Sequence, residues 1–564
     1  MKEAVINVLK KVLDEKGINL KEEEIEKLIE VPPNSEMGDY AFPCFFLSEK
    51  LKDEPSQIAL EIREKIGEPN ATDFEDIQTQ GPYINFFLNR KSLARKILWD
   101  INFSQKDNYG RTKIGNNKKI VIEFSSPNIA KPFGIGHLRS TIIGNSLTKI
   151  FEFLGYKVIK INYLGDWGTQ FGKLIFGYKK FGDKKKLKKD PIKHLLYVYV
   201  KANQKRYEQK ARDEFRKLEN GDKENFLLWR LFRNLSLGEF KKIYKKFGII
   251  FDVYDGESFY RSKAKEIIEE LKEKKIIKES KGALIVDLEQ YGLQTAIIEK
   301  SDGTTLYATR DIAAAIDRYK KYNFEKMIYE VGQEQRLYFM QIFKILELMG
   351  NTWAKNCFHV YHGFYLDSKG KKFATRKGKT IFLEEIFKKT LSLAKKEILK
   401  RKPKISKRDL EKKALKIAIA AIFYGDLKNN RTNNIVFDIK RFISFEGDTG
   451  PYLQYSYARA GSILKKVPRK QKKYEIYSLE SKEIELIKKI SQFPEIVISA
   501  GKNFNPSIIA NYAYQLAQVF NEFYHSCKVV GSEQEAFRLE LVQAFRQTLK
   551  NALRLLGIGT VDEM

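Results

Sequence analysis

Cysteine is scarce in this chain: there are only three in 564 residues, and Cys44, Cys357 and Cys527 lie far apart. Without a C-x-x-C pair, the sequence does not support a zinc knuckle. Isolated thiols suit a reducing compartment, so we expect a cytoplasmic protein. Long apolar runs are also missing, because the run from Ile417 to Tyr424 is among the longest and is far shorter than a membrane span. The amino-terminal residues have interleaved charge and do not form a signal sequence, so we expect no membrane partner.

Acidic residues are outnumbered: Asp and Glu total 72 against 103 Lys and Arg, which gives a net charge of +31. Such an excess favours a polyanionic partner such as a nucleic acid, because neutralising phosphates releases counterions. The alternative is a lysine-rich surface that reflects coding bias or growth temperature. The length is too great for one hydrophobic core, so several domains are expected.

The chain is organised around residues 122–145. A strand-like run over 119–124 ends at a cluster of turn formers, and apolar residues at helical spacing then continue to Leu154. Gly155 supplies a helix stop, and a second strand-like run follows over 158–163. This pattern predicts a βαβ unit whose turn lies at the carboxyl end of its first strand, where open parallel sheets bind nucleotides.

The chemistry of the turn fits a phosphate. Gly134 and Gly136 lack Cβ atoms, so a ligand can approach the backbone. The helix start favours an anion, and Lys131 and His137 can add donors. Taken as a bare motif, G-x-G-H describes equally well a tight strand-to-helix turn with a surface histidine.

The whole string, S-P-N-I-A-K-P-F-G-I-G-H-L-R-S-T over residues 126–141, resembles the first signature (H-I-G-H) of class I aminoacyl-tRNA synthetases, in the version of the arginyl enzymes. The family usually has histidine where this chain has Gly134, so His137 is the signature's only histidine. The contribution of that first position stays open, and we assign Gly134 no direct chemical role beyond its place in the expected ATP site.

A basic loop follows at residues 369–379, with six cations in eleven residues. From the pattern alone it is equally an exposed loop on a basic protein. The string K-F-A-T-R-K-G over 372–378 resembles the second class I signature, K-M-S-K-S. Thr375 stands where most class I enzymes have the critical lysine, which leaves Lys131 or Lys377 to replace it. The resemblance implies catalytic roles for Lys131, His137, Lys372 and Lys377, and ATP contacts from Gly134, Gly136, His137, Phe373, Ala374, Thr375 and Arg376.

The resemblance also implies an arginine pocket. Glu257 and Asp311 match family positions that hold the substrate guanidinium, and Tyr307 matches a position beside them. Carboxylates suit this role because they can accept two hydrogen bonds from a planar guanidinium. Asn128 and Gln335 match positions that hold the amino-acid end, and Glu123 is a second candidate. From the pattern alone, Asp311 is equally a capping group near a helix start.

Two further stretches resemble the RNA-binding parts of arginyl-tRNA synthetases. The strings G-D-Y and G-P-Y-I-N-F resemble their amino-terminal domain, which implies that Asp39, Tyr40 and Asn85 touch the elbow of the tRNA. The carboxyl-terminal N-A-L-R string resembles the D-A-L-R anticodon-binding domain, with Asn551 in place of the aspartate. The tRNA contacts implied there are Tyr452, Tyr455, Arg459 and Met564, and core packing is the alternative for any single tyrosine.

We therefore expect an α/β fold: a Rossmann-like parallel-sheet catalytic domain over 113–390 with a helical insertion at about 178–250, an amino-terminal α+β domain over 1–112, a helical connector over 391–445 and an all-α domain over 446–564. The implied activity is an arginine–tRNA ligase, which activates L-arginine with ATP and charges tRNA(Arg). We expect Mg²⁺ to arrive with ATP and not in a protein cage, and we expect a monomer. The alternatives are a catalytically silent tRNA-binding homologue and a small-substrate nucleotidyltransferase.

Overall fold

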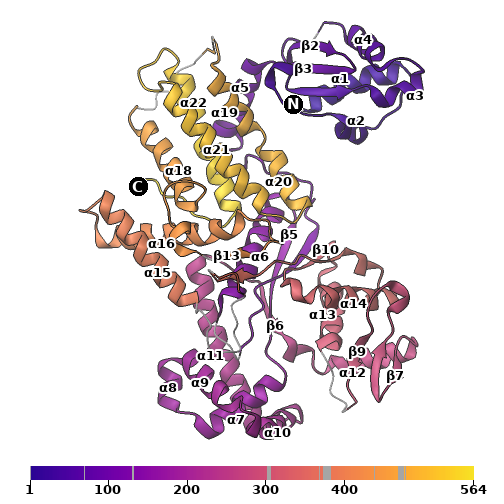
Figure 1. Ribbon diagram of the computed structural model, residues 1–564, viewed down its shortest axis with the longest axis vertical. Helices are drawn as coiled ribbons and strands as arrows, with labels where there is room; N and C mark the ends of the chain where they lie inside the picture. The colour runs from indigo at the N-terminus through magenta and orange to yellow at the C-terminus, as the bar shows by residue number, and fades with distance from the viewer. Residues whose placement is uncertain are drawn as a thin grey trace. The chain divides into compact units, whose positions relative to one another are not determined.

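The computed structural model describes residues 2–68, 70–129, 133–301, 307–367, 369–371, 383–436, 438–467, 475–476 and 478–564 (Figure 1). The chain forms two compact units. The first comprises residues 1–109, 463–492 and 518–548, and the second comprises residues 110–462, 493–517 and 549–564. The four-domain division that we expect from the sequence stays a prediction.

The first unit begins with a small antiparallel sheet in the order β1-β3-β2. Its elements are α1 (Lys2–Glu15), α2 (Glu22–Leu28), β1 (Tyr40–Pro43), α3 (Ser48–Leu51), α4 (Pro55–Ile66), β2 (Phe74–Gln80) and β3 (Tyr83–Leu88). The apolar stripe of α1 faces the core, where Val5, Leu9 and Leu13 are fully buried. Helix α4 starts with Pro55. Proline is favourable there because the N–H that it lacks would have no acceptor within the helix at the first position.

Helices complete the first unit. They are α5 (Arg90–Trp99), a widened π-helical turn (Asp100–Ser104), α19 (Ser481–Ser491) and the parts of α21 (Ser507–Ser526) and α22 (Glu535–Leu555) that belong to it. The Arg538 guanidinium is buried among them and donates to Glu483 at 2.7 Å and to Glu480. One guanidinium thus contacts the buried carboxylate of Glu483 and the more exposed carboxylate of Glu480.

The second unit is built on a five-stranded parallel sheet in the order β11-β10-β4-β5-β6. The strands are β4 (Lys119–Glu123), β5 (Lys157–Leu164), β6 (Val253–Gly256), β10 (Lys326–Tyr329) and β11 (Cys357–His359). Ile120, Val121 and Ile122 of β4 are fully buried, as expected for a strand covered on both faces. The strand order reverses between β4 and β10, and a crevice forms at such a reversal.

Helix α6 (Ile135–Phe153) connects β4 to β5. A Cβ on Gly144 would lie 2.2 Å from the Phe124 ring, so glycine lets the helix pack directly against the chain that leaves β4. Gly155 has a φ of +86° just after the helix, which is the left-handed stop that the sequence predicts.

Helices fill the chain between β5 and β6, as predicted. They are α7 (Thr169–Phe181), α8 (Lys184–Lys189), α9 (Pro191–Ala202), α10 (Glu208–Glu219) and α11 (Lys223–Phe247). The side chains of Asp183, Asp190 and Asp222 cap the starts of α8, α9 and α11 by accepting backbone N–H groups. These local caps fix where each insertion helix begins.

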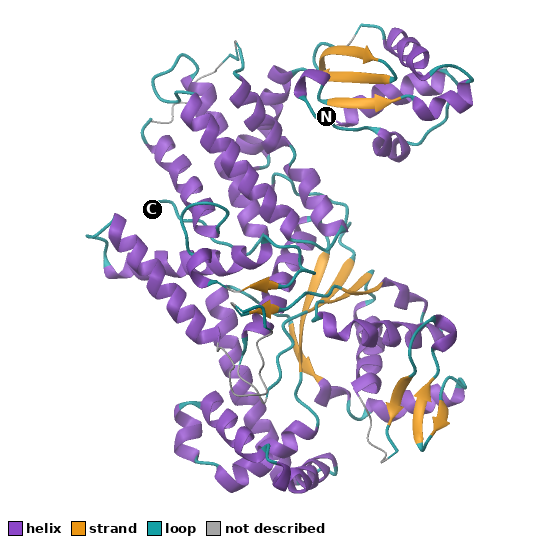
Figure 2. Ribbon diagram, in the orientation of Figure 1, coloured by secondary structure: helices purple, strands orange, loops and turns teal. Residues whose placement is uncertain are grey.

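The rest of the second unit surrounds the sheet with helices, and Figure 2 shows its strands set among them. After β6 come α12 (Lys263–Glu273), the antiparallel strands β7 (Lys278–Ser280), β8 (Ala283–Val286) and β9 (Ala296–Glu299), α13 (Tyr307–Tyr322) and α14 (Arg336–Leu348). The later elements are β12 (Tyr365–Leu366), α15 (Leu383–Arg401), α16 (Lys407–Leu427), β13 (Ile435–Val436), α17 (Ile439–Phe442), α18 (Gly450–Lys465) and α20 (Phe493–Lys502). The expected fold class is confirmed. Among the described residues, no helix has the length and hydropathy that a bilayer crossing requires.

Candidate active site

A cavity of about 980 Å³ opens at the carboxyl ends of β4 and β10. It therefore lies where the strand order reverses, the usual ligand position in open parallel sheets. The residues predicted from the sequence that line it are Glu123, Asn128, Gly134, Gly136, His137, Glu257, Tyr307, Asp311 and Gln335. One cavity thus joins the glycine–histidine turn to the predicted carboxylates.

The glycine–histidine turn forms the start of α6, which follows Gly134 in an extended conformation. The backbone N–H of Gly134 donates to Nδ1 of His137 at 3.2 Å. Because Nδ1 accepts this bond, the neutral imidazole carries its proton on Nε2. A Cβ on Gly136 would meet no atom within 4 Å, so the backbone there is open to a ligand. Together with the helix dipole, this turn is suited to hold an anion.

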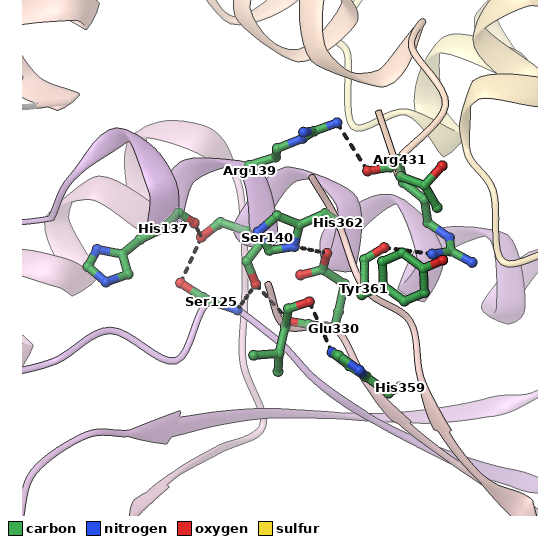
Figure 3. Close-up of polar contacts among 12 residues, drawn as sticks. Ser125, His137, Arg139, Ser140, Glu330, His359, Tyr361, His362 and Arg431 are labelled. Carbon is green, nitrogen blue, oxygen red and sulfur yellow. Dashed lines mark hydrogen bonds and ion pairs between the residues drawn. The ribbon is translucent and has the colours of Figure 1, made fainter. Parts of the chain in front are cut away.

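The link from β4 to α6 is strained and held in place by hydroxyl groups. Ser125 and Ser126 have φ values of +72° and +40°, and a non-glycine residue in that region costs roughly 1–3 kcal/mol. The Ser125 N–H donates to Oγ of Ser140 at 2.9 Å, and that hydroxyl donates to the Glu330 carbonyl oxygen at 2.9 Å (Figure 3). One hydroxyl therefore ties the ends of β4 and β10 to the first turns of α6.

Glu330 and His362 form a buried pair in the cavity wall that we did not predict from the sequence. Glu330 directly follows β10 and is fully buried. Its Oε1 lies 2.8 Å from Nδ1 of His362, and its Oε2 has no hydrogen-bond partner among the described residues. Figure 3 shows the pair beside Ser140 and His359, and burial lowers the pKa of His359 to about 4. The sequence did offer one sign of this pair, because Glu330 is an acidic residue directly after the apolar strand β10.

We expect His362→Leu to destabilise the second unit by about 1–3 kcal/mol, because it removes the hydrogen bond that His362 makes with the fully buried carboxyl group of Glu330. Thermal unfolding of the full-length chain measures this loss. The matched control is the double variant Glu330→Gln/His362→Leu, in which no charge is left unpaired and much of the loss should be recovered. A His362→Leu protein that melts like the parent contradicts the assignment.

One face of α13 also lines the cavity. Tyr307, Asp311, Ala314 and Arg318 recur at helical spacing along it and all line the cavity. The Tyr338 hydroxyl donates to Oδ2 of Asp311 at 2.5 Å. Burial raises the pKa of Asp311, against the opposing effect of that hydroxyl. Asp311 is thus a carboxylate held in a fixed orientation toward the cavity.

Glu257 and Glu123 each face an arginine of the chain itself. Arg310 Nη2 lies 3.4 Å from Oε2 of Glu257, and Arg318 Nη1 donates to Oε2 of Glu123 at 2.5 Å. Burial raises the pKa of Glu257 to about 8 and that of Glu123 to about 7, although the neighbouring arginine opposes the rise in each case. The geometry therefore gives Glu123 an internal guanidinium partner, which favours a positioning role for it.

Asn128 and Gln335 are two amide side chains in the cavity lining. Asn128 pairs with Gly165 in a parallel bridge, and its Oδ1 accepts from Gln170 Nε2 at 3.5 Å. A Cβ on Gly165 would lie 2.4 Å from that oxygen, so the approach requires glycine. Gln335 is exposed at the end of a 3₁₀ turn. Their roles toward an amino acid stay predictions.

Part of the predicted ATP site lies outside the described residues. It comprises Lys131 and the stretch that carries Lys372, Phe373, Ala374, Thr375, Arg376 and Lys377. Which lysine replaces the missing signature lysine is therefore still open.

The amino-terminal residues predicted to touch tRNA lie in the first unit. The Asp39 carboxylate accepts the Leu88 N–H at 2.9 Å and pairs with Lys488. Tyr40 lies in the β1–β3 ladder and is partly exposed. Asn85 is only 5% exposed, so its side chain has little surface to offer an RNA. Direct RNA contact by these residues stays a prediction.

The carboxyl-terminal residues predicted to touch tRNA lie in the second unit. Tyr452, Tyr455 and Arg459 are partly exposed on one face of α18. The Arg459 guanidinium lies over the Tyr455 ring at 4.9 Å, and Met564 lines a small cavity with Phe445. Stacked aromatic and cationic groups of this kind suit an RNA base, and their RNA contacts stay a prediction.

Comparison with known proteins extends these observations to the whole chain. Residues 101–439 match the family model described as "tRNA synthetases class I (R), catalytic domain". Residues 453–564 match the "DALR anticodon binding domain", and residues 1–88 match the "Arginyl tRNA synthetase N terminal domain". The three matches follow the order that the sequence motifs indicate.

Individual relatives agree with the family models. The arginine–tRNA ligase of Halothermothrix orenii is 46% identical over 100% of this chain and 99% of its own length. That of Clostridium perfringens is 45% identical over 97% of this chain and 98% of its own. The solved Thermus thermophilus arginyl-tRNA synthetase superposes with a TM-score of 0.83 at 24% identity, and each chain is covered in full. The last likeness concerns the fold alone. From the catalytic-domain match and the full-length relatives, the chain belongs to the family of class I arginyl-tRNA synthetases.

Proposed function

We propose that the chain is an arginine–tRNA ligase, which activates L-arginine with ATP and transfers the arginyl group to the 3′-terminal adenosine of tRNA(Arg). The observation that carries the proposal is the single cavity lined by the Gly134–His137 turn and by Asp311. In this assignment ATP lies across the turn at the start of α6. The arginine guanidinium lies against α13, and its carboxylate points toward the α-phosphate.

Asp311 is the carboxylate assigned to the substrate guanidinium. Among the described residues it forms no ion pair with an arginine, whereas Glu257 and Glu123 do. Glu257 and Tyr307 complete the wall around it. A planar guanidinium can donate two parallel hydrogen bonds to a pair of acceptors. A lysine ammonium is a compact point charge and cannot make the same paired contact. The carboxylates therefore support selection of arginine over lysine.

Two transfers follow from this placement. An oxygen of the arginine carboxylate attacks the α-phosphorus in line, a new P–O bond forms, and the bond to pyrophosphate breaks. A ribose hydroxyl of the tRNA end then attacks the arginyl carbonyl carbon, and AMP leaves. No protein nucleophile is required, so positioning and charge stabilisation carry the rate. His137 Nε2–H would donate to phosphate oxygens as their charge grows.

Magnesium is assigned to the nucleotide. The buried carboxylates Glu123, Glu257 and Glu330 are each paired with a cationic or imidazole side chain, which favours a Mg²⁺ held by phosphate oxygens and water. The ion would neutralise charge on the leaving pyrophosphate. A monomeric state and a cytoplasmic location stay predictions.

The direct test is to charge total tRNA with each labelled amino acid in turn, in the presence of ATP. We expect esterification with arginine only and release of one pyrophosphate per ester formed. A different amino acid on the tRNA would overturn the assignment. The two alternatives, a silent tRNA-binding homologue and a small-substrate nucleotidyltransferase, are not favoured by the full-length likeness to arginine–tRNA ligases.

Arginine binding is expected to strengthen as pH rises from 6 to 8. Burial holds the Glu257 pKa at about 8 in the empty cavity, so the carboxyl is mostly protonated below that pH. A bound guanidinium favours the ionised form, so binding releases a proton, and the dissociation constant falls by up to about tenfold per pH unit below the pKa. Calorimetry in two buffers of different ionisation heat measures the released proton. In Glu257→Gln the dissociation constant for arginine should depend less steeply on pH. A dissociation constant that does not change with pH in the parent would contradict the prediction.

A further inference from the structure

The outer face of α5 and of the widened turn after it carries two exposed aromatic rings. Trp99 is 62% exposed and Phe103 is 37% exposed. Their ring centroids lie 5.1 Å apart with an interplanar angle of 28°, so the rings are stacked on each other. The other three tryptophans, Trp167, Trp229 and Trp353, are at most 8% exposed. Packing in a hydrophobic core therefore accounts for the other three tryptophans but not for Trp99.

Packing and hydrogen bonds on the inner side orient this face outward. The residues of α5 and the turn that face inward are Leu93, Ala94, Ile97, Leu98 and Ile101, all buried. The Gln105 N–H donates to the Asp100 carbonyl at 2.7 Å, which closes the five-residue turn. Asn102 donates to the side chain and the carbonyl of Glu540 at 2.6 and 3.0 Å. Trp99 and Phe103 thus lie on the outer face, opposite the packed inner side.

Cations share the face. Arg95 and Lys96 are exposed and lie one helical turn before Trp99. The four residues Arg95, Lys96, Trp99 and Phe103 are named here the α5 face. An aromatic platform beside two cations matches the two requirements of single-stranded nucleic acid, which are a surface for base stacking and a charge for the phosphate. A partner protein would not require the cations, and the chain's net charge of +31 further favours RNA.

We propose that the α5 face binds an unpaired nucleotide of the tRNA, whose base stacks on Trp99 while Arg95 and Lys96 contact the adjoining phosphates. The proposal rests on the proposed function for the identity of the RNA. It adds a base-stacking site on residues 95–103, outside the ranges matched by the amino-terminal and anticodon-binding family models.

The test uses the full-length chain and a tRNA(Arg) transcript. Because Trp99 is the exposed tryptophan, titration with the transcript should quench the intrinsic emission. The quench should disappear in Trp99→Phe, which removes the exposed fluorophore and keeps a smaller stacking ring. The double variant Trp99→Ala/Phe103→Ala should raise the KM for tRNA about tenfold or more, since a lost base–aromatic stack is typically of that size. Its KM values for arginine and ATP should not change.

A second pair of variants separates charge from stacking. Arg95→Ala/Lys96→Ala should reduce the slope of log affinity against log salt by about one to two, the value for two lost phosphate contacts. Ile250→Ala, at another exposed apolar residue, is the matched control and should leave tRNA binding unchanged.

Unchanged emission at saturating transcript, or a double variant with the parent KM for tRNA, would overturn the proposal. So would a change in oligomeric state by light scattering in Trp99→Ala, which would assign the face to self-association. A chain that shows the quench but esterifies no arginine would contradict the proposed function alone, so the two failures are distinguishable.

Discussion

Asp311→Ala is expected to raise the KM for arginine by about 10²-fold or more, while the KM for ATP changes little. Truncating one partner of a buried, hydrogen-bonded charge pair typically costs about 2–5 kcal/mol, and each 1.4 kcal/mol is a factor of ten. Asp311 is oriented by the Tyr338 hydroxyl at 2.5 Å and lies on the α13 wall of the cavity. Initial-rate kinetics of tRNA charging, with each substrate varied in turn, measure the effect.

Two controls identify which property of Asp311 matters. Asp311→Asn keeps the shape and an oxygen that can accept from Tyr338 but removes the charge, so its loss should approach that of alanine. Tyr338→Phe keeps the carboxylate and removes only the hydroxyl that orients it, so its loss should be several-fold at most. Equal losses for arginine and ATP in Asp311→Ala would contradict a guanidinium site at this residue.

His137→Ala is expected to lower the rate of adenylate formation by about 10²-fold or more, the usual effect of removing one transition-state donor. Because Nδ1 of His137 accepts the Gly134 N–H, the Nε2 proton is the one directed to a phosphate. Arginine affinity should change little, since the proposed guanidinium site is on α13. Pyrophosphate exchange in the presence of tRNA, or single-turnover adenylate formation, gives the rate.

The two amide substitutions of His137 separate its two nitrogens. Asn places an oxygen near the position of Nδ1 and can keep the bond from the Gly134 N–H, but it supplies no donor at Nε2. Gln can place an amide N–H near the position of Nε2. We therefore expect Gln to retain more activity than Asn if the donor carries the rate. Parent turnover in His137→Ala would remove His137 from the mechanism.

The strand, glycine–histidine turn and helix of the candidate site could be predicted from the sequence because their structure is local. The apolar strand before Ser125, the glycines at 134 and 136 and the helix that ends at Gly155 lie within one continuous stretch. Short-range rules fix such a turn, and the parallel sheet then places it at the carboxyl edge. The choice of Asp311 and Glu257 depended instead on the family resemblance, since nothing in their local pattern distinguishes them from a helix cap or a turn.

Long-range pairing was decided by the tertiary structure alone. The sequence does not show that Glu123 would meet Arg318, that Glu257 would meet Arg310, or that Glu330 and His362 would face each other in the cavity wall. Each pair joins residues on separate elements, and a buried charge is stable only where the fold supplies its partner. The sequence determined the fold class, the glycine–histidine turn and the family, because these depend on local patterns and a resemblance over the whole chain. The tertiary structure decided that Glu123 and Glu257 each lie beside an arginine of the chain, because ion pairing depends on distance in space and on desolvation.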